Sequence, residues 1–490
     1  MKRRVIVALL LIPSFLLGGC KPSDKKDNNK PDGNTLDETS KITTGTIEER
    51  LAKLNRVTNL TPLTAGGQYN KVWRFDFKQY IDHDHKELGY FNQRVEFAYI
   101  DIDSPNLYVS EGYMLQVGNY SYYSGENEIA QLFGCNYLFV EHRYFGTSLP
   151  VKIDYSKADT WKYLTTAQAA ADAHEIVTQF KRILDGKWAS SGASKGGMTT
   201  EMYAYYYPGE MDIYVPYVAP FCNSFEDLRM IHFLDQETGN VAYGETKAAE
   251  MRQDMLSFQL KLLEYRDILA PRFYQEGLSS GVIYSNYTTA DNLFDASVME
   301  FEVGFWQYDQ NYDALKAALN MSESTTSEKE AKLEECYDVF TNVCSPEDLG
   351  MNNAYTPYYI QAYQELGNYG YDFTKIRNNL PEGVNLSVTR EEETALMWKL
   401  VLSDVERSIG HKELIYSKIN NMLQTTEDEF VIIYGSSDPW YAVRPDDVTD
   451  RENISIYVNK KHPHGACISN FDSQAKKRIT LRIKAALGIE

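Results

Sequence analysis

The chain has 490 residues, of which 43% are hydrophobic and 13% aromatic, and it contains 37 tyrosines. This is more than one core usually holds, so we expect either one large domain with an insertion or two domains. The formal net charge of −20 argues against nucleic acid as a partner, because phosphate recognition needs a basic face.

The first 20 residues have the features of a lipoprotein signal peptide. Basic residues at positions 2–4 precede an apolar run over residues 5–17, which is too short for an ordinary membrane-spanning helix. The Leu-Gly-Gly-Cys sequence that ends at Cys20 resembles the lipobox of bacterial lipoproteins, in which the cysteine is lipidated and becomes the first residue. A plain secretory signal with an incidental cysteine is the alternative.

The polar residues 21–44 contain no aromatic side chain and predict a disordered tether between the lipid and the folded domain. Together with the lipobox, they predict an exported lipoprotein at the bacterial outer membrane or cell surface, held to the membrane by its lipid anchor.

Neither a metal nor a cofactor is expected. The five cysteines beyond Cys20 include no Cys-x-x-Cys pair. Exported chains can form disulfides, and Cys336 and Cys344 are the closest pair in sequence, but an odd number leaves at least one thiol unpaired. His83 and His85 are only two residues apart, and without further ligands such histidines are usually surface residues.

The next segments alternate between strand-like and helix-like patterns. Residues 71–101 predict antiparallel strands, residues 113–117 a more apolar strand and residues 136–141 a buried strand. A capping box of Thr165 and Gln168 predicts the start of a helix that runs to about residue 184. This order of strands and helices is typical of a mostly parallel sheet.

Residues 192–196 read Gly-Ala-Ser-Lys-Gly, a G-x-S-x-G pattern centred on Ser194. A short strand-like segment, residues 187–191, precedes it, and residues 195–207 follow with apolar side chains at helical spacing. A serine between strand and helix lies on a tight turn, where only small neighbours fit and its hydroxyl is pushed out of the sheet. Because a free serine hydroxyl is a poor nucleophile, it needs a base and an oxyanion site at the same place.

Two later loops supply an acid and a base. Asp438 follows an apolar strand predicted over residues 430–434, and His464 follows another over residues 454–458. The order serine, acid, histidine is that of the α/β-hydrolases. Histidine can take the serine proton and return it to the leaving group, while the aspartate holds the imidazole in the right tautomer. His462 competes for the role of base; we favour His464, because glycine follows it whereas proline follows His462.

The tetrahedral intermediate of such a reaction also needs backbone N–H donors. One is expected from Lys195, the residue after the nucleophile. The other is expected from Asn119 or Tyr120, beyond the apolar strand predicted over residues 113–117.

The stretch between nucleophile and acid is far longer than one strand–helix–strand unit, which takes roughly 30 residues. Residues 222–427 are helical in pattern and rich in tyrosine, glutamate and lysine. We interpret them as a helical cap inserted between the nucleophile and the acid. The fold predicted for residues 45–221 and 428–490 is the α/β-hydrolase fold.

Two charged segments have simpler explanations than catalysis. Glu141, His142 and Arg143 end a predicted strand and are expected to form a buried polar network beneath the catalytic floor. Glu226 and Asp227 begin the cap and could meet a substrate ammonium, but a solvated helix start explains them better.

Six motifs occur in order: QYIDH at 79–83, FNQR at 91–94, EHRYFGTSLP at 141–150, GASKGGMT at 192–199, DPW at 438–440 and HGA at 464–466. Together they resemble the prolylcarboxypeptidase and dipeptidyl peptidase II group of serine peptidases. The segments around the serine and the histidine look closer to the bacterial relatives of that group, the secreted prolyl tri/tetrapeptidyl aminopeptidases. The match covers roughly residues 70–220 and 430–470 and leaves the cap unaligned.

This resemblance implies an exopeptidase that releases short peptides from an N-terminus and prefers proline just before the scissile bond. It also implies Ser194, Asp438 and His464 as the catalytic triad. Ala193 and Lys195, which flank the serine, depart from the prolylcarboxypeptidase pattern, so the end of the peptide that is recognised stays open from that comparison.

The leading hypothesis is a lipid-anchored serine exopeptidase that releases tri- or tetrapeptides from proline-containing peptides through an acyl-enzyme. One alternative is an esterase or lipase on the same fold. Another is a surface peptide-binding protein that keeps the hydrolase shape without catalysis.

Overall fold

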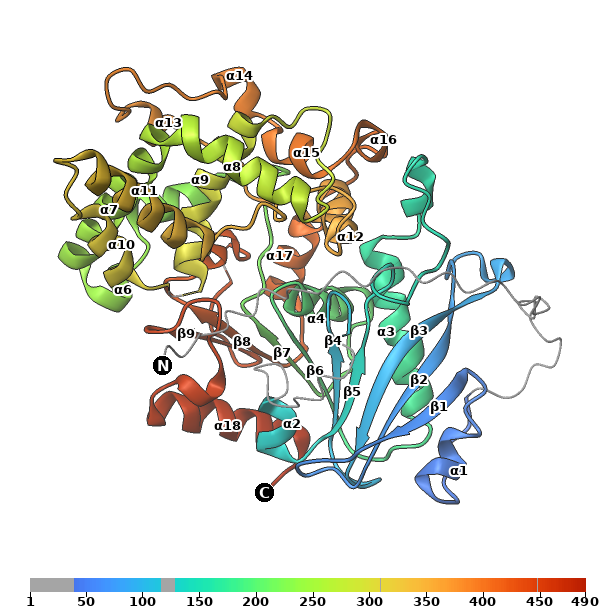
Figure 1. Ribbon diagram of the computed structural model, residues 1–490. Coiled ribbons are helices and arrows are strands. Elements are labelled where there is room, and N and C mark those ends of the chain that lie inside the picture. Colours follow the sequence, from blue (N-terminus) through green and yellow to red (C-terminus); the bar gives the residue numbers. More distant parts are fainter. Residues whose placement is uncertain (1–38, 116–127, 309, 447) are drawn as a thin grey trace.

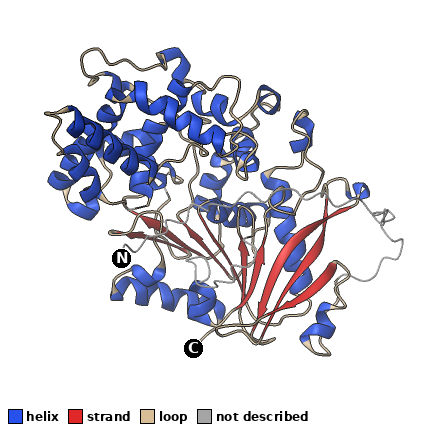
Figure 2. Ribbon diagram, viewed as in Figure 1, coloured by secondary structure: helices blue, strands red, loops and turns tan. Residues whose placement is uncertain are grey.

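A computed structural model describes residues 39–115, 128–308, 310–446 and 448–490. Within these ranges one sheet lies at the centre of the molecule, and helices cover both of its faces (Figures 1 and 2). Its strands are β1 (Val57–Leu63), β2 (Lys71–Tyr80), β3 (Tyr90–Tyr99), β4 (Asn106–Ser110), β5 (Asn136–Val140), β6 (Trp188–Ala193), β7 (Ile213–Tyr217), β8 (Phe430–Gly435) and β9 (Ile454–Asn459). The helices around it are α1 (Ile47–Leu51), α2 (Glu128–Phe133), α3 (Thr166–Phe180), α4 (Lys195–Tyr206) and α18 (Ser473–Leu487).

The strands lie in the order β1-β2-β3-β5-β4-β6-β7-β8-β9. From β5 to β9 every neighbouring pair is parallel, whereas β1, β2 and β3 pair antiparallel and β3 joins β5 antiparallel. The parallel strands β4, β7 and β8 are buried over their whole length, because helices cover both faces of a parallel sheet. The predicted mostly parallel sheet is confirmed.

Alternate side chains of the central strands belong to two different cores. On β4, Tyr108 packs into the core that contains Phe180 of α3 and Met202 of α4. Leu107 and Val109 lie on the opposite face, in the core formed with α2 and α18. Because side chains alternate across a strand, five residues contribute to both layers.

Between β7 and β8 the chain leaves the sheet and forms a group of helices, residues 229–425, which we call the cap segment (Figure 1). Thr289 and Thr325 begin two of its longer helices with capping boxes. None of the helices described, here or elsewhere in the chain, is long and apolar enough to cross a membrane. The helices of the cap segment are α5 (Arg229–Gln236), α6 (Asn240–Tyr243), α7 (Glu245–Glu264), α8 (Arg266–Ser279), α9 (Ala290–Gln307), α10 (Tyr312–Leu319), α11 (Thr326–Thr341), α12 (Thr356–Gln361), α13 (Thr374–Arg377), α14 (Arg390–Glu393), α15 (Leu396–Val401), α16 (Asp404–Arg407) and α17 (Tyr416–Thr425).

The strand expected over residues 113–117 is wrong for residues 113–115, and residues 116 and 117 lie outside the described residues. The strand that enters the sheet here is β4, and residues 111–115 form a loop after it. Leu115 is buried, and the ring of Tyr113 packs edge-on against that of Phe145, with centroids 5.6 Å apart. The apolar pattern therefore reflects burial of a loop and not pairing of a strand.

The tether predicted over residues 21–44 is too long at its end. The N–H of Ile42 donates to the carbonyl of Arg182 at 2.7 Å, and the guanidinium of Arg50 donates to the carbonyl of Thr43 at 2.6 Å. These backbone groups find partners just beyond α3 and on α1, so polar composition alone misplaced the start of the domain. The signal peptide, Cys20 and the first part of the tether lie outside the described residues.

The five cysteines in the described ranges carry free thiols. Cys336 lies within α11 and Cys344 follows it, where its Sγ contacts the carbonyl of Ser297 at 3.4 Å. The pair considered from the sequence is therefore not a disulfide.

Candidate active site

Ser194 lies on a strained turn between β6 and α4. Its backbone φ is 54°, in the left-handed region that residues with side chains usually avoid. A Cβ on Gly192 would lie 2.4 Å from the carbonyl carbon of Gly196, and one on Gly196 would lie 2.7 Å from the carbonyl oxygen of Ser110. Only glycine fits at these positions, which explains the strand–turn–helix geometry behind the G-x-S-x-G pattern.

His464 and Asp438 are joined by a hydrogen bond. Nδ1 of His464 lies 2.7 Å from Oδ2 of Asp438. The carboxylate follows β8 and is fully buried, and its other oxygen accepts from the N–H of Trp440 at 3.1 Å. With both oxygens engaged, the aspartate holds the imidazole in one orientation.

The cap segment also holds His464. The N–H of His464 donates to the carbonyl of Gln307 at the end of α9 (3.2 Å), and its ring lies edge-on to that of Tyr308 with centroids 6.4 Å apart. His462 is exposed instead, and its N–H donates to the side chain of Asn459 at 3.1 Å. Of the two histidines, His464 is therefore the one that meets an aspartate.

Ser194 and His464 line one cavity of about 700 Å³, which also has side chains of the cap segment in its wall. They reach it from loops that follow β6 and β9, whose carboxyl ends lie at the same edge of a parallel sheet. Among the described residues no hydrogen bond joins the Ser194 hydroxyl to the imidazole; catalytic bonds of this kind are often long before substrate binds.

Two backbone N–H groups at this cavity have no acceptor in the described part of the chain. One is that of Lys195, in the first turn of α4, where helical N–H groups lack internal partners. The other is that of Met114, in the loop after β4. Asn119 and Tyr120, predicted as donors, lie outside the described residues.

Comparison with known proteins identifies the family. Residues 47–490 match the family described as PS-10 peptidase S37. The chain belongs to this family. This confirms the relationship inferred from the motifs.

Two relatives show how far the similarity of this S37 chain extends. It is 30% identical over 292 residues to a prolyl tri/tetrapeptidyl aminopeptidase of Streptomyces mobaraensis, which covers 59% of this chain and 56% of that protein. It is 35% identical over 86 residues to a lysosomal Pro-X carboxypeptidase of Bos taurus, which covers 16% of this chain and 17% of that protein. The longer match thus spans little more than half of that relative.

The fold is the predicted α/β-hydrolase fold, with the sheet order and the strand–turn–helix elbow described above. Among solved structures, a homoserine O-acetyltransferase of Bacillus anthracis overlaps with a TM-score of 0.37 and 10% identity, over 86% of this chain and 97% of that one. A proline iminopeptidase of Mycobacterium smegmatis overlaps with a TM-score of 0.28 and 11% identity, over 81% and 93%. Overlaps this low bear on neither substrate nor mechanism.

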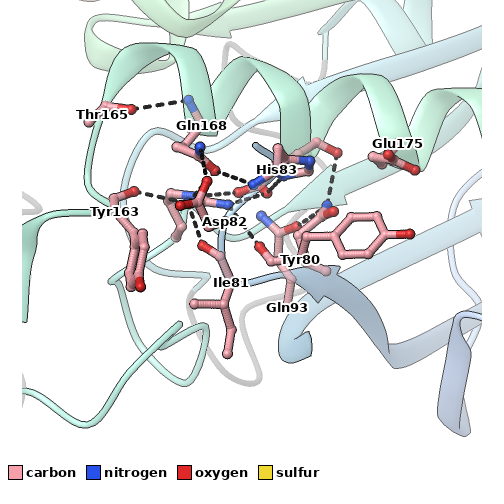
Figure 3. A network of polar contacts seen from close by, with 12 residues as sticks. Tyr80, Ile81, Asp82, His83, Gln93, Tyr163, Thr165, Gln168 and Glu175 are labelled. Carbon is pink, nitrogen blue, oxygen red and sulfur yellow. Dashed lines mark hydrogen bonds and ion pairs between the residues drawn. The ribbon is translucent and has the colours of Figure 1, made fainter. Parts of the chain in front are cut away.

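Three of the motifs that indicated the S37 relationship meet in one buried network (Figure 3). The fully buried guanidinium of Arg143 donates to both oxygens of Asp172 on α3, at 2.7 and 2.6 Å. Nε2 of His83 lies 2.8 Å from the same carboxylate. The Gln93 side chain joins the network by donating to the carbonyl of Glu141 at 2.9 Å. The side chains of Glu141, His142 and Arg143 are all buried, as predicted, and that of Arg143 belongs to this network.

The structure corrects two expectations for this region. His83 is not a surface residue, because α3 packs over the end of β2 and Asp172 meets its ring, whereas His85 is exposed. Gln168 does not complete a capping box: its side chain accepts from the N–H of His83 at 2.9 Å, and α3 ends at Phe180, before residue 184. Within the described ranges, no group of three His, Cys, Asp or Glu side chains is placed to hold a metal ion.

Carboxylates line the cap side of the cavity. Glu300 on α9 accepts from the hydroxyls of Tyr369 and Tyr371, each at 2.5 Å, and burial raises its pKa. Asp348 lines the same cavity, and burial raises its pKa to about 7. No basic side chain in the described part of the chain acts on either pKa. Glu300 and Asp348 therefore lack a compensating cation among the described residues.

The sequence pattern did not indicate these carboxylates and pointed to two others, Glu226 and Asp227. Asp227 is buried in an ion pair with Arg229 at 2.7 Å, so it does not belong to a solvated helix start. Glu226 accepts from the N–H of Ala395 at 2.6 Å. Neither lines the cavity. Nothing in the sequence distinguishes Glu300 from the other glutamates of the cap segment.

Aromatic rings form much of the remaining wall. Trp440, beside the triad candidate Asp438, lies edge-on to Tyr369 with centroids 5.4 Å apart. Rings of this kind can stack on a proline ring or an apolar side chain. The aromatic residues that line the cavity are Tyr113, Tyr308, Tyr355, Tyr358, Tyr359, Tyr369 and Trp440.

Proposed function

We propose that this chain is a serine exopeptidase that releases tri- or tetrapeptides from the N-terminus of peptides and cleaves preferentially after proline. The observation that carries the proposal is the cavity itself. It is lined by a serine on a strained elbow and by a histidine bonded to a buried aspartate. Membership of the S37 peptidase family supports the same reaction class.

Each residue of the proposed triad has one role. His464 takes the proton of Ser194 as the serine oxygen bonds to the scissile carbonyl carbon, and Asp438 stabilises the imidazolium that forms. The C–N bond then breaks as the imidazolium gives its proton to the leaving amine, and an acyl-enzyme remains. Water, deprotonated by the same histidine, attacks the ester and releases the short peptide.

The oxyanion of each tetrahedral intermediate needs donors that are already in place. The N–H of Lys195 is one. For the second, the sequence pointed to Asn119 or Tyr120. The N–H of Met114, which lines the cavity and has no acceptor among the described residues, supports a donor that comes earlier in the chain.

Charge favours recognition of an N-terminus over a C-terminus. Four carboxylates line the cavity: Glu111, Glu300, Glu347 and Asp348. The described residues that line the cavity include one lysine, Lys195, and its ammonium donates to a backbone carbonyl. A substrate ammonium gains from these charges, whereas a substrate carboxylate is repelled.

The preference for proline rests on the aromatic wall of the cavity and on the names of the two relatives, a prolyl aminopeptidase and a Pro-X carboxypeptidase. A site beside the elbow that is lined by rings accepts the compact proline side chain. The inserted cap segment limits access for long folded chains.

We further propose that the protein is exported and anchored by a lipid on Cys20, at the outer membrane or cell surface. The basic, apolar and Leu-Gly-Gly-Cys segments of residues 2–20 support this. Metabolic labelling with an alkyne fatty acid tests it. Label is expected on the wild-type protein and not on Cys20→Ala, and an unlabelled wild type would contradict the anchor.

The test of activity uses protein that lacks residues 1–20 and a peptide library with proline at positions two to five, each peptide with a free or an acetylated N-terminus. Mass spectrometry is expected to find N-terminal tri- and tetrapeptides ending in proline from free N-termini only. Ser194→Ala is expected to abolish both turnover and labelling by a fluorophosphonate. Turnover of acyl esters without peptides would indicate an esterase, and binding without cleavage would indicate a peptide-binding protein.

A further inference from the structure

The side chain of Lys195 is buried directly beside the nucleophile. It is 1% exposed, and its ammonium donates to the carbonyl of Gly112 at 2.7 Å. The ammonium also lies 5.6 Å from the ring centroid of Tyr113 and 5.4 Å from that of Phe145. Burial lowers the pKa of this lysine to about 7. Burying an amine costs free energy of folding, so stability alone does not explain the contact of this lysine with Gly112.

That contact joins two segments that meet at the cavity. Lys195 begins α4 after β6, and Gly112 lies in the loop after β4, the strand that pairs with β6. The two segments approach closely, because a Cβ on Gly112 would lie 2.7 Å from the N–H nitrogen of Gly196. The loop therefore packs directly against the elbow that carries Ser194.

The other side of the loop is bonded to the segment after β5. The N–H of His142 donates to the carbonyl of Tyr113 at 3.0 Å. The N–H of Leu115 donates to the fully buried carboxylate of Glu141 at 2.9 Å. Met114, between Tyr113 and Leu115, lines the cavity, and its N–H has no acceptor among the described residues.

We propose that Lys195 is a positioning residue whose ammonium clamps the loop of residues 111–115 against the nucleophile elbow. The clamp sets the N–H of Met114 beside the N–H of Lys195, so that both stabilise the oxyanion. The inference rests on the proposed serine-peptidase function and adds a role for a side chain. Lys195 supplies one oxyanion donor, its backbone N–H. Through the contact of its ammonium with the loop, it also aligns the other donor, the N–H of Met114.

Lys195→Met tests the clamp, because methionine fills similar space without an ammonium. If the oxyanion donor is displaced, kcat is expected to fall about 10²-fold while KM changes less than about threefold, since the donor acts only in the transition state. A peptidyl boronic acid, which mimics the tetrahedral state, is expected to lose the same factor in affinity. Unfolding temperature is expected to stay equal or rise, because a buried amine is removed.

A matched control is Lys181→Met. Lys181, directly after α3, is partly buried, and its ammonium also donates to a backbone carbonyl, that of Glu210. The kcat of Lys181→Met and its affinity for the boronic acid are expected to match those of the wild type. The clamp is wrong if Lys195→Met keeps kcat within threefold of wild type, or if kcat falls only in step with unfolding.

Gly112→Ala moves the same loop without changing the side chain of the lysine, although the new Cβ would lie 3.0 Å from the carbonyl carbon of Lys195. Its Cβ meets the backbone of Gly196, and its φ of 83° disfavours a side chain, so the same loss of kcat at nearly constant KM is expected. Wild-type kinetics of this variant would also overturn the clamp.

Three further outcomes separate the failure of this inference from the failure of the function on which it rests. Turnover that survives in Ser194→Ala removes the serine-peptidase proposal itself. An inactive Ser194→Ala together with a fully active Lys195→Met removes only the clamp. If Lys195→Met is as inactive as Ser194→Ala while His464→Ala retains activity, lysine is the base and the clamp is overturned.

Discussion

The imidazole of His464 lies 2.7 Å from the carboxylate of Asp438, which follows a different strand and is fully buried. Burial and the second bond from Trp440 leave this carboxylate one orientation in which to meet the ring. An acceptor at Nδ1 directs the proton there and leaves Nε2 free to act as base.

Asp438→Asn is expected to lower kcat about 10⁴-fold, because an amide at this position can donate to Nδ1 and favours the wrong tautomer. Steady-state kinetics on a proline-containing peptide measure the loss. His462→Ala is the control and is expected to keep wild-type kinetics, since this histidine is exposed. An equal loss of kcat in the control would show that the role of base was assigned to the wrong histidine.

Glu300→Gln is expected to weaken recognition of the substrate N-terminus. The variant keeps the size of the side chain and removes an acidic group that no cation of the described chain balances. We expect kcat/KM for peptides with a free N-terminus to fall about 10- to 100-fold, in line with loss of a charge-assisted contact. Acetylated peptides are expected to change little.

The matched control for this charge is Glu226→Gln, at a glutamate near the start of the cap segment that does not line the cavity. It is expected to leave the ratio between free and acetylated peptides unchanged. If Glu300→Gln lowers kcat/KM equally for free and acetylated peptides, Glu300 does not recognise the ammonium.

Asp172→Asn is expected to destabilise the fold without changing specificity. The variant leaves the buried guanidinium of Arg143 without its carboxylate, and breaking a buried ion pair in this way costs about 3–5 kcal/mol. Chemical denaturation measures the change in the free energy of unfolding. Asp154→Asn, which breaks an exposed pair with Lys157, is expected to have little effect; similar losses in both variants would contradict the role of burial.

Glu201→Leu is expected to stabilise the protein increasingly as pH rises. Both oxygens of this buried carboxyl on α4 lack partners in the described structure, and burial raises its pKa well above the usual value. Above about pH 4.5 the unfolded chain releases the proton while the folded chain keeps it. Wild-type stability therefore falls by up to about 1.4 kcal/mol per pH unit until the raised pKa is reached.

Denaturant unfolding at several pH values between 5 and 8 checks this prediction. Glu201→Gln serves as the control, because it removes the titrating proton but keeps an unpartnered polar group. It is expected to lose the pH dependence without the full gain in stability. Curves for wild type and Glu201→Leu that run parallel across this range would show that Glu201 does not titrate as described.

Several features of this protein could be read from local patterns. Glycine spacing identified the turn at Ser194, and apolar strands located the loops that carry Asp438 and His464. Local apolar patterns were misleading where residues are buried for a reason other than pairing in the sheet. Residues 113–115 lie in a loop in which Leu115 is buried, while the true strand, Asn106–Ser110, is less regular in sequence.

The sequence by itself determined most of the elements around the sheet, their order and the three residues proposed for catalysis, because strand and helix periods and tight turns depend on neighbours in the chain. Only the tertiary structure decided what surrounds those residues. The carboxylate of Glu300 enters the cavity, and the ammonium of Lys195 reaches Gly112, through contacts between segments about 80 or more positions apart. Such contacts depend on how the cap segment and the loops pack over the sheet, and no local pattern encodes that packing.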